Sequence, residues 1–164
     1  MSFVGRLLGQ KLMRSLSTNI PAFIAAVLVT YSAAAPLLTQ LNLAAITALG
    51  YEVPVPLRLT TTLQDFLGLL SLYAPVLAFS LCLAFVFTHF VLGRLIQQSL
   101  FLYALAGFTG VAAAHLAMNA VFGLIVVAPV RSYTGLLSQA FAGALGGAAF
   151  WIFRQCISKR YNKQ

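Results

Sequence analysis

The sequence predicts an all-α integral membrane protein, an antiparallel bundle of four transmembrane helices with a short periplasmic surface helix. Of its 164 residues, 61% are hydrophobic and only 7% are charged, whereas soluble domains carry roughly 25% charged residues. A soluble fold of this size has too little interior to bury so much apolar surface. The chain also contains four apolar runs of the ~20 residues that cross a bilayer, with the charges at their ends and in the turns.

A basic segment precedes the first apolar run. Residues 1–16 contain Arg6, Lys11, Arg14 and no acid, and their apolar residues follow helical spacing. An amphipathic helix of this kind lies in the headgroup layer of a membrane, and a frayed basic tail is the alternative. Because the following apolar run is long enough to span, we expect an uncleaved signal anchor rather than a cleaved signal peptide, with a mitochondrial presequence as a minor alternative.

The spans follow from the lengths of the apolar runs. Pro36 lies inside the first run and should kink or end its helix near the far side. Short turns at 95–99 and 127–134 make the spans on either side of each turn antiparallel neighbours. We expect one membrane domain, residues 1–164, with spans at about 20–41, 69–93, 98–126 and 135–157.

Residues 42–68 form the one long connection. Pro54 and Pro56 keep the stretch YEVPVP out of a helix interior. The following LRLTTTLQDFLGLL has apolar residues at helical spacing, a threonine at 60–62 to cap the helix, and Asp65 early enough to suit the helix dipole. We therefore expect a short helix here that lies on the membrane surface and runs into the second span.

The distribution of cations predicts the orientation. Four spans place both chain ends on one side, and Lys and Arg are enriched in cytoplasmic loops. The opposite side holds only Arg58 and Arg131, together with the two acids of the chain, Glu52 and Asp65. Both termini should therefore be cytoplasmic. The eight basic residues on their side are Arg6, Lys11, Arg14, Arg94, Arg154, Lys159, Arg160 and Lys163.

One stretch, RLTTTLQDFLGLLSLYAPVLAFSLCLAF, resembles a segment of small four-span inner-membrane proteins of proteobacteria. In those proteins, as here, a threonine-leucine-x-aspartate run precedes a glycine, a tyrosine or similar residue, and a proline that opens the next helix. The later run AFAGALGGAAF is also similar, and the likeness covers residues 25–150 in outline. The resemblance implies this architecture and a bacterial inner membrane, and it implies no activity or functional residue.

His115 and Asn119 are unusual polar residues in an apolar run. Residues four apart share a helix face, and polar side chains in a membrane are costly unless they face other helices. Hydrogen bonding between helices and contact with a ligand are both open interpretations. No second metal-ligating side chain lies at ligand spacing, so no metal is expected. His89 and His115 should lie at different depths, so neither haem nor any other cofactor is expected.

Polar residues also gather in the outer third of the expected bundle, and every span contributes some. This asymmetry favours a polar pocket or seam open to the outside, while the ordinary polarity of helix ends is the alternative. Asp65 and Arg131, one on each outer connection, could pair just above it. The candidate ligand-binding residues are Tyr73, Asp65, His115, Asn119, Arg131 and Gln139.

Small residues four apart mark faces where helices approach closely. We expect them to pack the third span against the fourth, with a docking face for another protein as the alternative. The residues are Gly110 and Ala114, preceded by Ala106, in the third span, and Ala142, Gly143, Gly146 and Gly147 in the fourth.

No catalytic motif is present, so we expect no enzyme. The basic residues form no stripe interleaved with aromatics, so nucleic-acid binding is not expected. The leading hypothesis is an accessory subunit or assembly partner of a larger inner-membrane complex, with other integral membrane subunits as partners. The alternative is a component that binds or transports a small molecule, lipid or quinone in a periplasm-facing polar pocket.

Overall fold

The structure, a computed structural model, describes residues 3–122 and 133–161, and every element in these two ranges is helical. Four of the helices are long and apolar enough to cross a membrane. This confirms the prediction of an all-helical chain with four helices long and apolar enough to span a membrane. These helical stretches are Ser15–Ala48, Leu70–Leu95, Leu100–Ala120 and Tyr133–Arg160.

The first helix, α1, is one continuous helix from Phe3 to Ala48. It merges the expected basic segment and first span, and it passes through Pro21 and Pro36. Of the two expected effects of Pro36, a kink or a helix end, the helix end is therefore wrong. A proline removes one backbone hydrogen bond, and in membrane helices neighbouring groups stabilise such a site. At ~1.5 Å per residue, these 46 residues are longer than a bilayer needs.

The connection expected at 42–68 is shorter in the structure, because α1 includes its first seven residues. Gly50, with φ of 91°, adopts the left-handed conformation that commonly follows a helix end. The next helix, α2, runs from Val55 to Gly68. It begins before the threonines that we expected to cap it, because Pro56 falls in its first turn, where a missing N–H costs nothing.

The second half of the chain is a succession of apolar helices. Helix α3 (Leu70–Phe87) continues through a π-helical turn, η1 (Thr88–Leu92), into the three-residue α4 (Gly93–Leu95). Helix α5 (Leu100–Phe122) follows, and α6 (Tyr133–Tyr161) completes the described chain.

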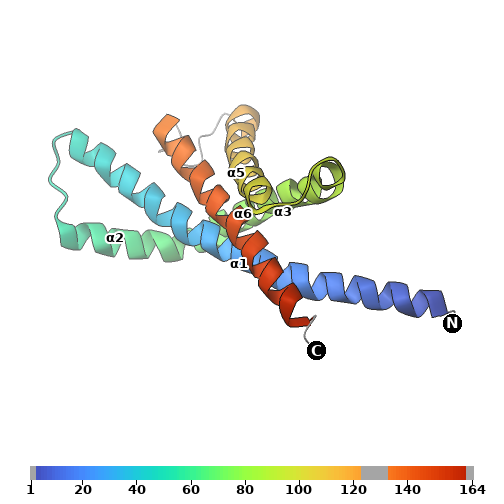
Figure 1. The fold of residues 1–164 in the computed structure, drawn as a ribbon. Coiled ribbons are helices and arrows are strands. Elements are labelled where there is room, and N and C mark those ends of the chain that lie inside the picture. The colour runs from blue at the N-terminus through green and yellow to red at the C-terminus, as the bar shows by residue number, and fades with distance from the viewer. Residues whose placement is uncertain (1–2, 123–132, 162–164) are drawn as a thin grey trace.

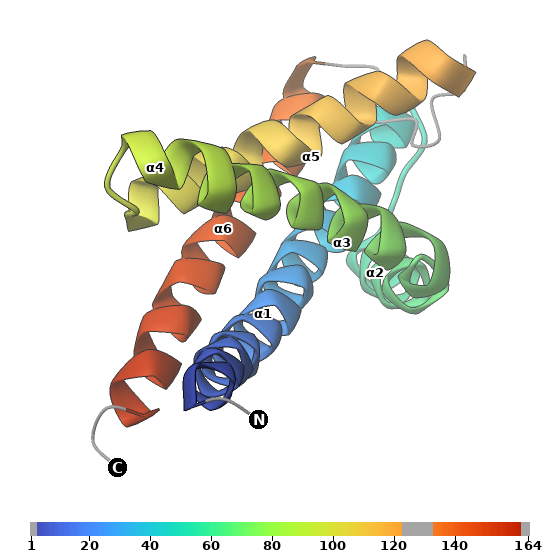
Figure 2. The same cartoon turned by 90° about the vertical axis from the view of Figure 1, so that its right-hand side faces the viewer.

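Helix α6 lies between α1 and α5 and packs extensively against both (Figures 1 and 2). It is antiparallel to α1, because Gln139 meets Ala34 while Gly146, further along, meets Thr30. Both chain ends lie at the same end of the molecule in the two views. Helix α3 is viewed nearly end-on in Figure 1, where α1 and α6 run across the page. The helices therefore cross one another, and a regular bundle stays a prediction.

Helix α2 folds back along the second half of α1 (Figure 1). The Tyr31 hydroxyl donates to the Phe66 carbonyl, and their rings also touch. Gln40 donates to the Thr62 hydroxyl at 2.9 Å. Since α2 has no buried residue, these polar and aromatic contacts with α1 position it.

Candidate functional site

A buried polar cluster joins all four spanning helices. The Tyr73 hydroxyl of α3 donates to Gln139 Oε1 of α6 at 2.8 Å and lies 3.0 Å from His115 Nε2 of α5. Gln139 Nε2 donates to the Ala34 carbonyl of α1 at 3.2 Å. Tyr73 is 5% exposed, His115 is 4% exposed and Gln139 is fully buried. We call Tyr73, His115 and Gln139 the polar node.

The polar node has more hydrogen-bond acceptors than the Tyr73 hydroxyl can satisfy. His115 Nδ1 lies 2.8 Å from the Val111 carbonyl, which only accepts, so the Nδ1 position carries a hydrogen. In a neutral imidazole Nε2 is then an acceptor, and it competes with Gln139 Oε1 for the single hydrogen of the Tyr73 hydroxyl. The node is thus a set of buried bonds, mostly between helices, in which two acceptors share one hydrogen.

The other sequence-derived candidates do not join the node. Asn119 is exposed, although it lies one turn beyond His115 on the same helix. Asp65 is half-buried in α2 and accepts a hydrogen bond from Thr39 Oγ1 at 2.9 Å. Arg131, and with it the proposed pairing of Arg131 with Asp65, lies outside the described residues. Of six candidates, the structure brings together Tyr73, His115 and Gln139.

Glycines bring the backbones of α5 and α6 into contact. A Cβ on Gly143 would meet the Gly107 carbonyl oxygen, and one on Gly147 would meet the Tyr103 carbonyl oxygen. Gly146 faces α1 instead, against the Thr30 hydroxyl. Ala142 is fully buried. All four of the marked small residues of α6 are therefore buried inside this chain.

The marked residues of α5 have a different neighbour from the expected one. Gly110 faces α3, where an added Cβ would lie 2.6 Å from the Ala84 side chain. Ala114 lines the space between α3 and α5. The glycine of α5 that meets α6 is Gly107, which the small-residue spacing did not single out because Val111 stands four residues later.

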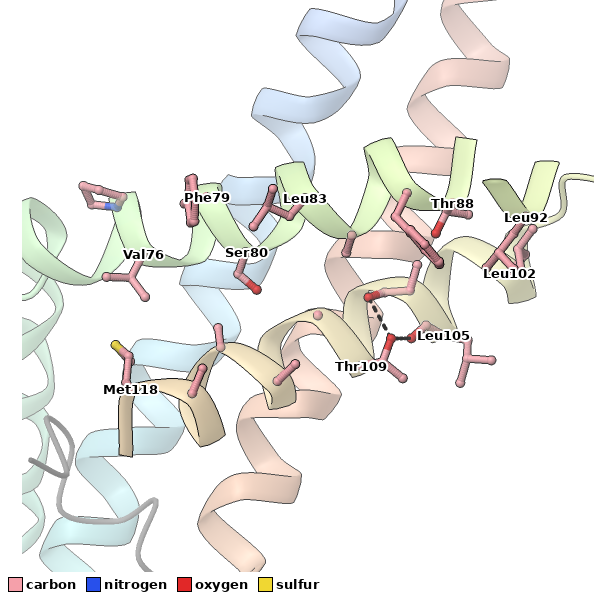
Figure 3. A pocket seen from close by; sticks show the side chains of 18 residues that line it. Val76, Phe79, Ser80, Leu83, Thr88, Leu92, Leu102, Leu105, Thr109 and Met118 are labelled. Atoms are coloured by element: carbon pink, nitrogen blue, oxygen red, sulfur yellow. Dashed lines mark hydrogen bonds between the residues drawn. The ribbon is translucent and has the colours of Figure 1, made fainter. Parts of the chain in front are cut away.

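An apolar groove of about 990 Å³ runs between α3 and α5. Large side chains of α3, among them Phe79 and Leu83, form one wall, as Figure 3 shows. Small residues of α5, namely Ala106, Gly110, Ala113, Ala114 and Ala117, form the other. We call this space the α3–α5 groove. Tyr73, His115 and Gln139 do not line it.

One polar atom in the groove lacks a partner. Ser80 Oγ is the only buried side-chain nitrogen or oxygen without a hydrogen bond in the part of the chain that the structure describes. The Ser80 side chain, 5% exposed, projects from α3 toward α5 in Figure 3. A serine in a helix usually bonds back to its own backbone, as Thr109 does to the Leu105 carbonyl at 2.9 Å. The Ser80 oxygen has almost no accessible surface and lies beside Gly110 of α5, so a ligand in the groove satisfies this hydroxyl after a rotation of the Ser80 side chain.

The described residues contain no group of three or more histidine, cysteine or acidic side chains able to hold a metal ion. His89 and His115 lie in separate clusters, since His89 contacts Gln98 near the turn before α5. Comparison with protein-family models, with curated proteins and with solved structures finds no match for this chain.

Proposed function

We propose that this chain is a non-enzymatic membrane protein that binds one neutral lipid in the α3–α5 groove. The unpaired Ser80 hydroxyl inside an apolar groove is the observation that carries the proposal. Apolar walls with very few convergent polar groups are typical of small-molecule sites, which measure ~300–1,000 Å³. The groove volume of about 990 Å³ lies at the top of that range.

The depth of Ser80 selects the class of lipid. Ser80 lies ten residues into the stretch Leu70–Leu95, which places it about 15 Å along the helix. That is roughly half of a ~30 Å hydrocarbon core. Phospholipid esters stay near the interface, so the ligand must carry its own oxygen into the core. A quinone or an isoprenoid alcohol has this chemistry.

Removing the hydroxyl tests the proposal through two opposite effects. Ser80→Ala should stabilise the lipid-free protein by about 1 kcal/mol, because it deletes an unsatisfied buried group. The same change should weaken retention of the neutral lipid by roughly five-fold, the value of one neutral hydrogen bond. Thermal unfolding in detergent measures the first effect, and mass spectrometry of lipid retained by the purified protein measures the second.

Matched variants separate the groove from general effects. Ala113→Leu fills the groove from an exposed position of α5 and should abolish lipid retention, whereas Ala44→Leu adds the same atoms to the exposed far end of α1. Ser71→Ala removes an exposed hydroxyl of α3 outside the groove. Equal lipid retention in the groove variants and in these controls would refute lipid binding.

The accessory-subunit hypothesis remains a second candidate, favoured by the small residues of α5 that line the groove. A helix of another subunit would then occupy the same space. Purification from native membranes in mild detergent distinguishes the two occupants. A stoichiometric partner chain that Ala113→Leu displaces, with no retained lipid, would replace the lipid proposal with the subunit one.

We further propose a bacterial inner membrane, antiparallel spans, cytoplasmic termini and a periplasmic α2, on the charge asymmetry and the resemblance described above. The native cysteines, Cys82 and Cys156, are exposed and should first be replaced by serine. In that background, Glu52→Cys should react in intact cells with a thiol reagent confined to the periplasm, and a cysteine appended to the N-terminus should not. The reverse labelling pattern would invert the topology.

A further inference from the structure

A second pocket, which is polar, lies between the first half of α1 and the last part of α6. Its volume is about 380 Å³. It opens between the first half of α1, the last part of α6 and the turn before α5. Hydroxyl, amide and guanidinium groups face it, and no lipid-binding function of the α3–α5 groove accounts for them. Its walls present Ser15, Thr18 and Asn19 from α1, and Arg154, Gln155 and Ser158 from α6.

Among the described side chains that line this pocket, Arg154 is the only charged one, and neutral groups hold it in place. Its Nη1 atom donates to Gln98 Oε1 at 2.9 Å and to the Tyr103 hydroxyl at 3.1 Å. These two bonds use both hydrogens of Nη1. The guanidinium carries three more N–H donors, on Nε and Nη2, in a fixed planar geometry.

The turn before α5 is built to keep the Gln98 acceptor facing Arg154. Gln98 Nε2 lies 3.3 Å from His89 Nδ1 of the π-helical turn η1. Because Arg154 can only donate, the amide oxygen of Gln98 faces Arg154 and its NH₂ group faces His89. Gly93 makes room for this side chain, because a Cβ there would lie 2.6 Å from Gln98 Nε2. Arg154 is therefore held by Gln98 of the turn and by Tyr103 of α5 before any ligand arrives. His89 of η1 and Gly93 of α4 in turn hold Gln98 in place.

No acidic side chain of the chain can neutralise Arg154. The only two, Glu52 and Asp65, lie in the connection beyond α1 and in α2. Thr39, which holds Asp65, and Thr18, which lines the pocket, are separated by 21 residues of α1. At ~1.5 Å per residue this is about 30 Å, several times the ~8 Å screening length of physiological salt. No acidic side chain of this chain therefore lies within reach of Arg154.

We propose that this pocket binds a phosphate group, supplied by the headgroup of an anionic phospholipid. The planar fork of an arginine matches the geometry of two phosphate oxygens, and Gln155 and Ser158 of the same pocket can donate to the others. Basic pockets between membrane helices recognise such headgroups. Trp151, in the same pocket, is the type of residue that marks a membrane–water boundary. The site needs no ligand in the α3–α5 groove.

The test titrates the full-length protein in detergent with phosphatidylglycerol, and with phosphatidylcholine as the zwitterionic reference. Native mass spectrometry counts bound lipid. The wild type should bind one phosphatidylglycerol in preference to phosphatidylcholine. Arg154→Gln should weaken this binding by roughly ten-fold, the value of charge-assisted hydrogen bonds. Arg154→Lys, which keeps the charge but not the fork, should fall between the two.

Two further variants keep the result interpretable. Arg160→Gln removes the same charge from an exposed position of the last turn of α6 and should leave the affinity within about two-fold. Ser158→Leu fills the pocket without touching the contacts that hold Arg154, so it should abolish binding. This variant keeps the site testable even if Arg154→Gln folds poorly. Equal effects of Arg154→Gln and Arg160→Gln, or no effect of Ser158→Leu, would overturn the site.

Inorganic phosphate separates the two sources of the group. If millimolar phosphate stabilises the wild type against heat but not Arg154→Gln, and displaces phosphatidylglycerol, the pocket accepts free phosphate and the lipid source is wrong. If phosphate has no effect while phosphatidylglycerol binds, the headgroup is the ligand. If neither binds in an Arg154-dependent manner, the proposal fails.

Discussion

Replacing Gly147 by alanine is expected to lower the free energy of unfolding by about 3 kcal/mol, the upper end of the usual range for an overpacked core. The new Cβ would overlap the Tyr103 carbonyl oxygen and lie 3.0 Å from the Cα atom of Ala104. Both are backbone atoms of α5, so no change of rotamer relieves the clash. Only a movement of α5 away from α6 does.

Trp151 is well placed to report that movement. It is the only tryptophan of the chain, and it stacks on Tyr103 with ring centroids 5.6 Å apart and an interplanar angle of 24°. Reversible unfolding in mixed micelles, followed by tryptophan fluorescence, should show a lower midpoint for Gly147→Ala. The emission of the folded variant should also change, because the stack sits on the displaced contact.

Gly68→Ala is the matched control. A Cβ on Gly68 meets no atom within 4 Å, and the residue is the last of helix α2. Alanine should be neutral there or stabilise by ~0.5–1 kcal/mol, because glycine is the poorer helix former. If Gly147→Ala unfolds at the same midpoint as Gly68→Ala, α5 and α6 do not approach as closely as the structure shows.

The spans could be predicted because they follow from composition alone. Apolar length decides whether a helix can cross a bilayer, and it requires no knowledge of neighbours. The end of α1 could not be predicted in this way. Pro36 suggested a stop, but its effect depends on the packing around it, and the adjoining Ala34 and Ala35 are fully buried against other helices. Local rules therefore failed where tertiary contacts decide.

The polar node could be predicted only in part. Polar residues at similar depth on antiparallel helices meet if the helices touch there, and Tyr73, His115 and Gln139 do. Asn119 shares the helix face of His115 but is exposed, because crossing helices stay in contact over a limited length. The α3–α5 groove arises from the same crossing. No spacing of residues within one helix reveals a gap between two helices.

Substitutions in the polar node should have the second large effect on stability. Gln139→Leu should destabilise the protein by about 2 kcal/mol, because it removes two buried hydrogen bonds at once, one to the Ala34 carbonyl of α1 and one from the Tyr73 hydroxyl of α3. Tyr73→Phe should cost about 1 kcal/mol. A hydrogen bond between membrane helices contributes on average only ~0.6 kcal/mol to stability, with a maximum near ~1.7. A loss of about 2 kcal/mol from one substitution therefore requires a residue that bonds to two helices. Gln139 does this, whereas the Tyr73 hydroxyl has a single hydrogen for two acceptors, Gln139 Oε1 and His115 Nε2.

A double-mutant cycle on Tyr73 and Gln139 measures the coupling between them, with Ser138→Ala as the control. Ser138 neighbours Gln139 but bonds only within α6, to the Gly135 carbonyl at 2.8 Å among the described contacts, so its loss should change stability by less than ~0.5 kcal/mol.

The variant that replaces Tyr73, His115 and Gln139 by Phe, Phe and Leu distinguishes a joint network from separate contacts. If the three act together, this variant should lose less stability than the sum of the single changes, because every partner side chain left unpaired by one substitution is removed by another. Only the Ala34 and Val111 carbonyls then lose a donor, and the latter keeps its place in the α5 backbone. Strict additivity would mean that the three side chains stabilise separate contacts.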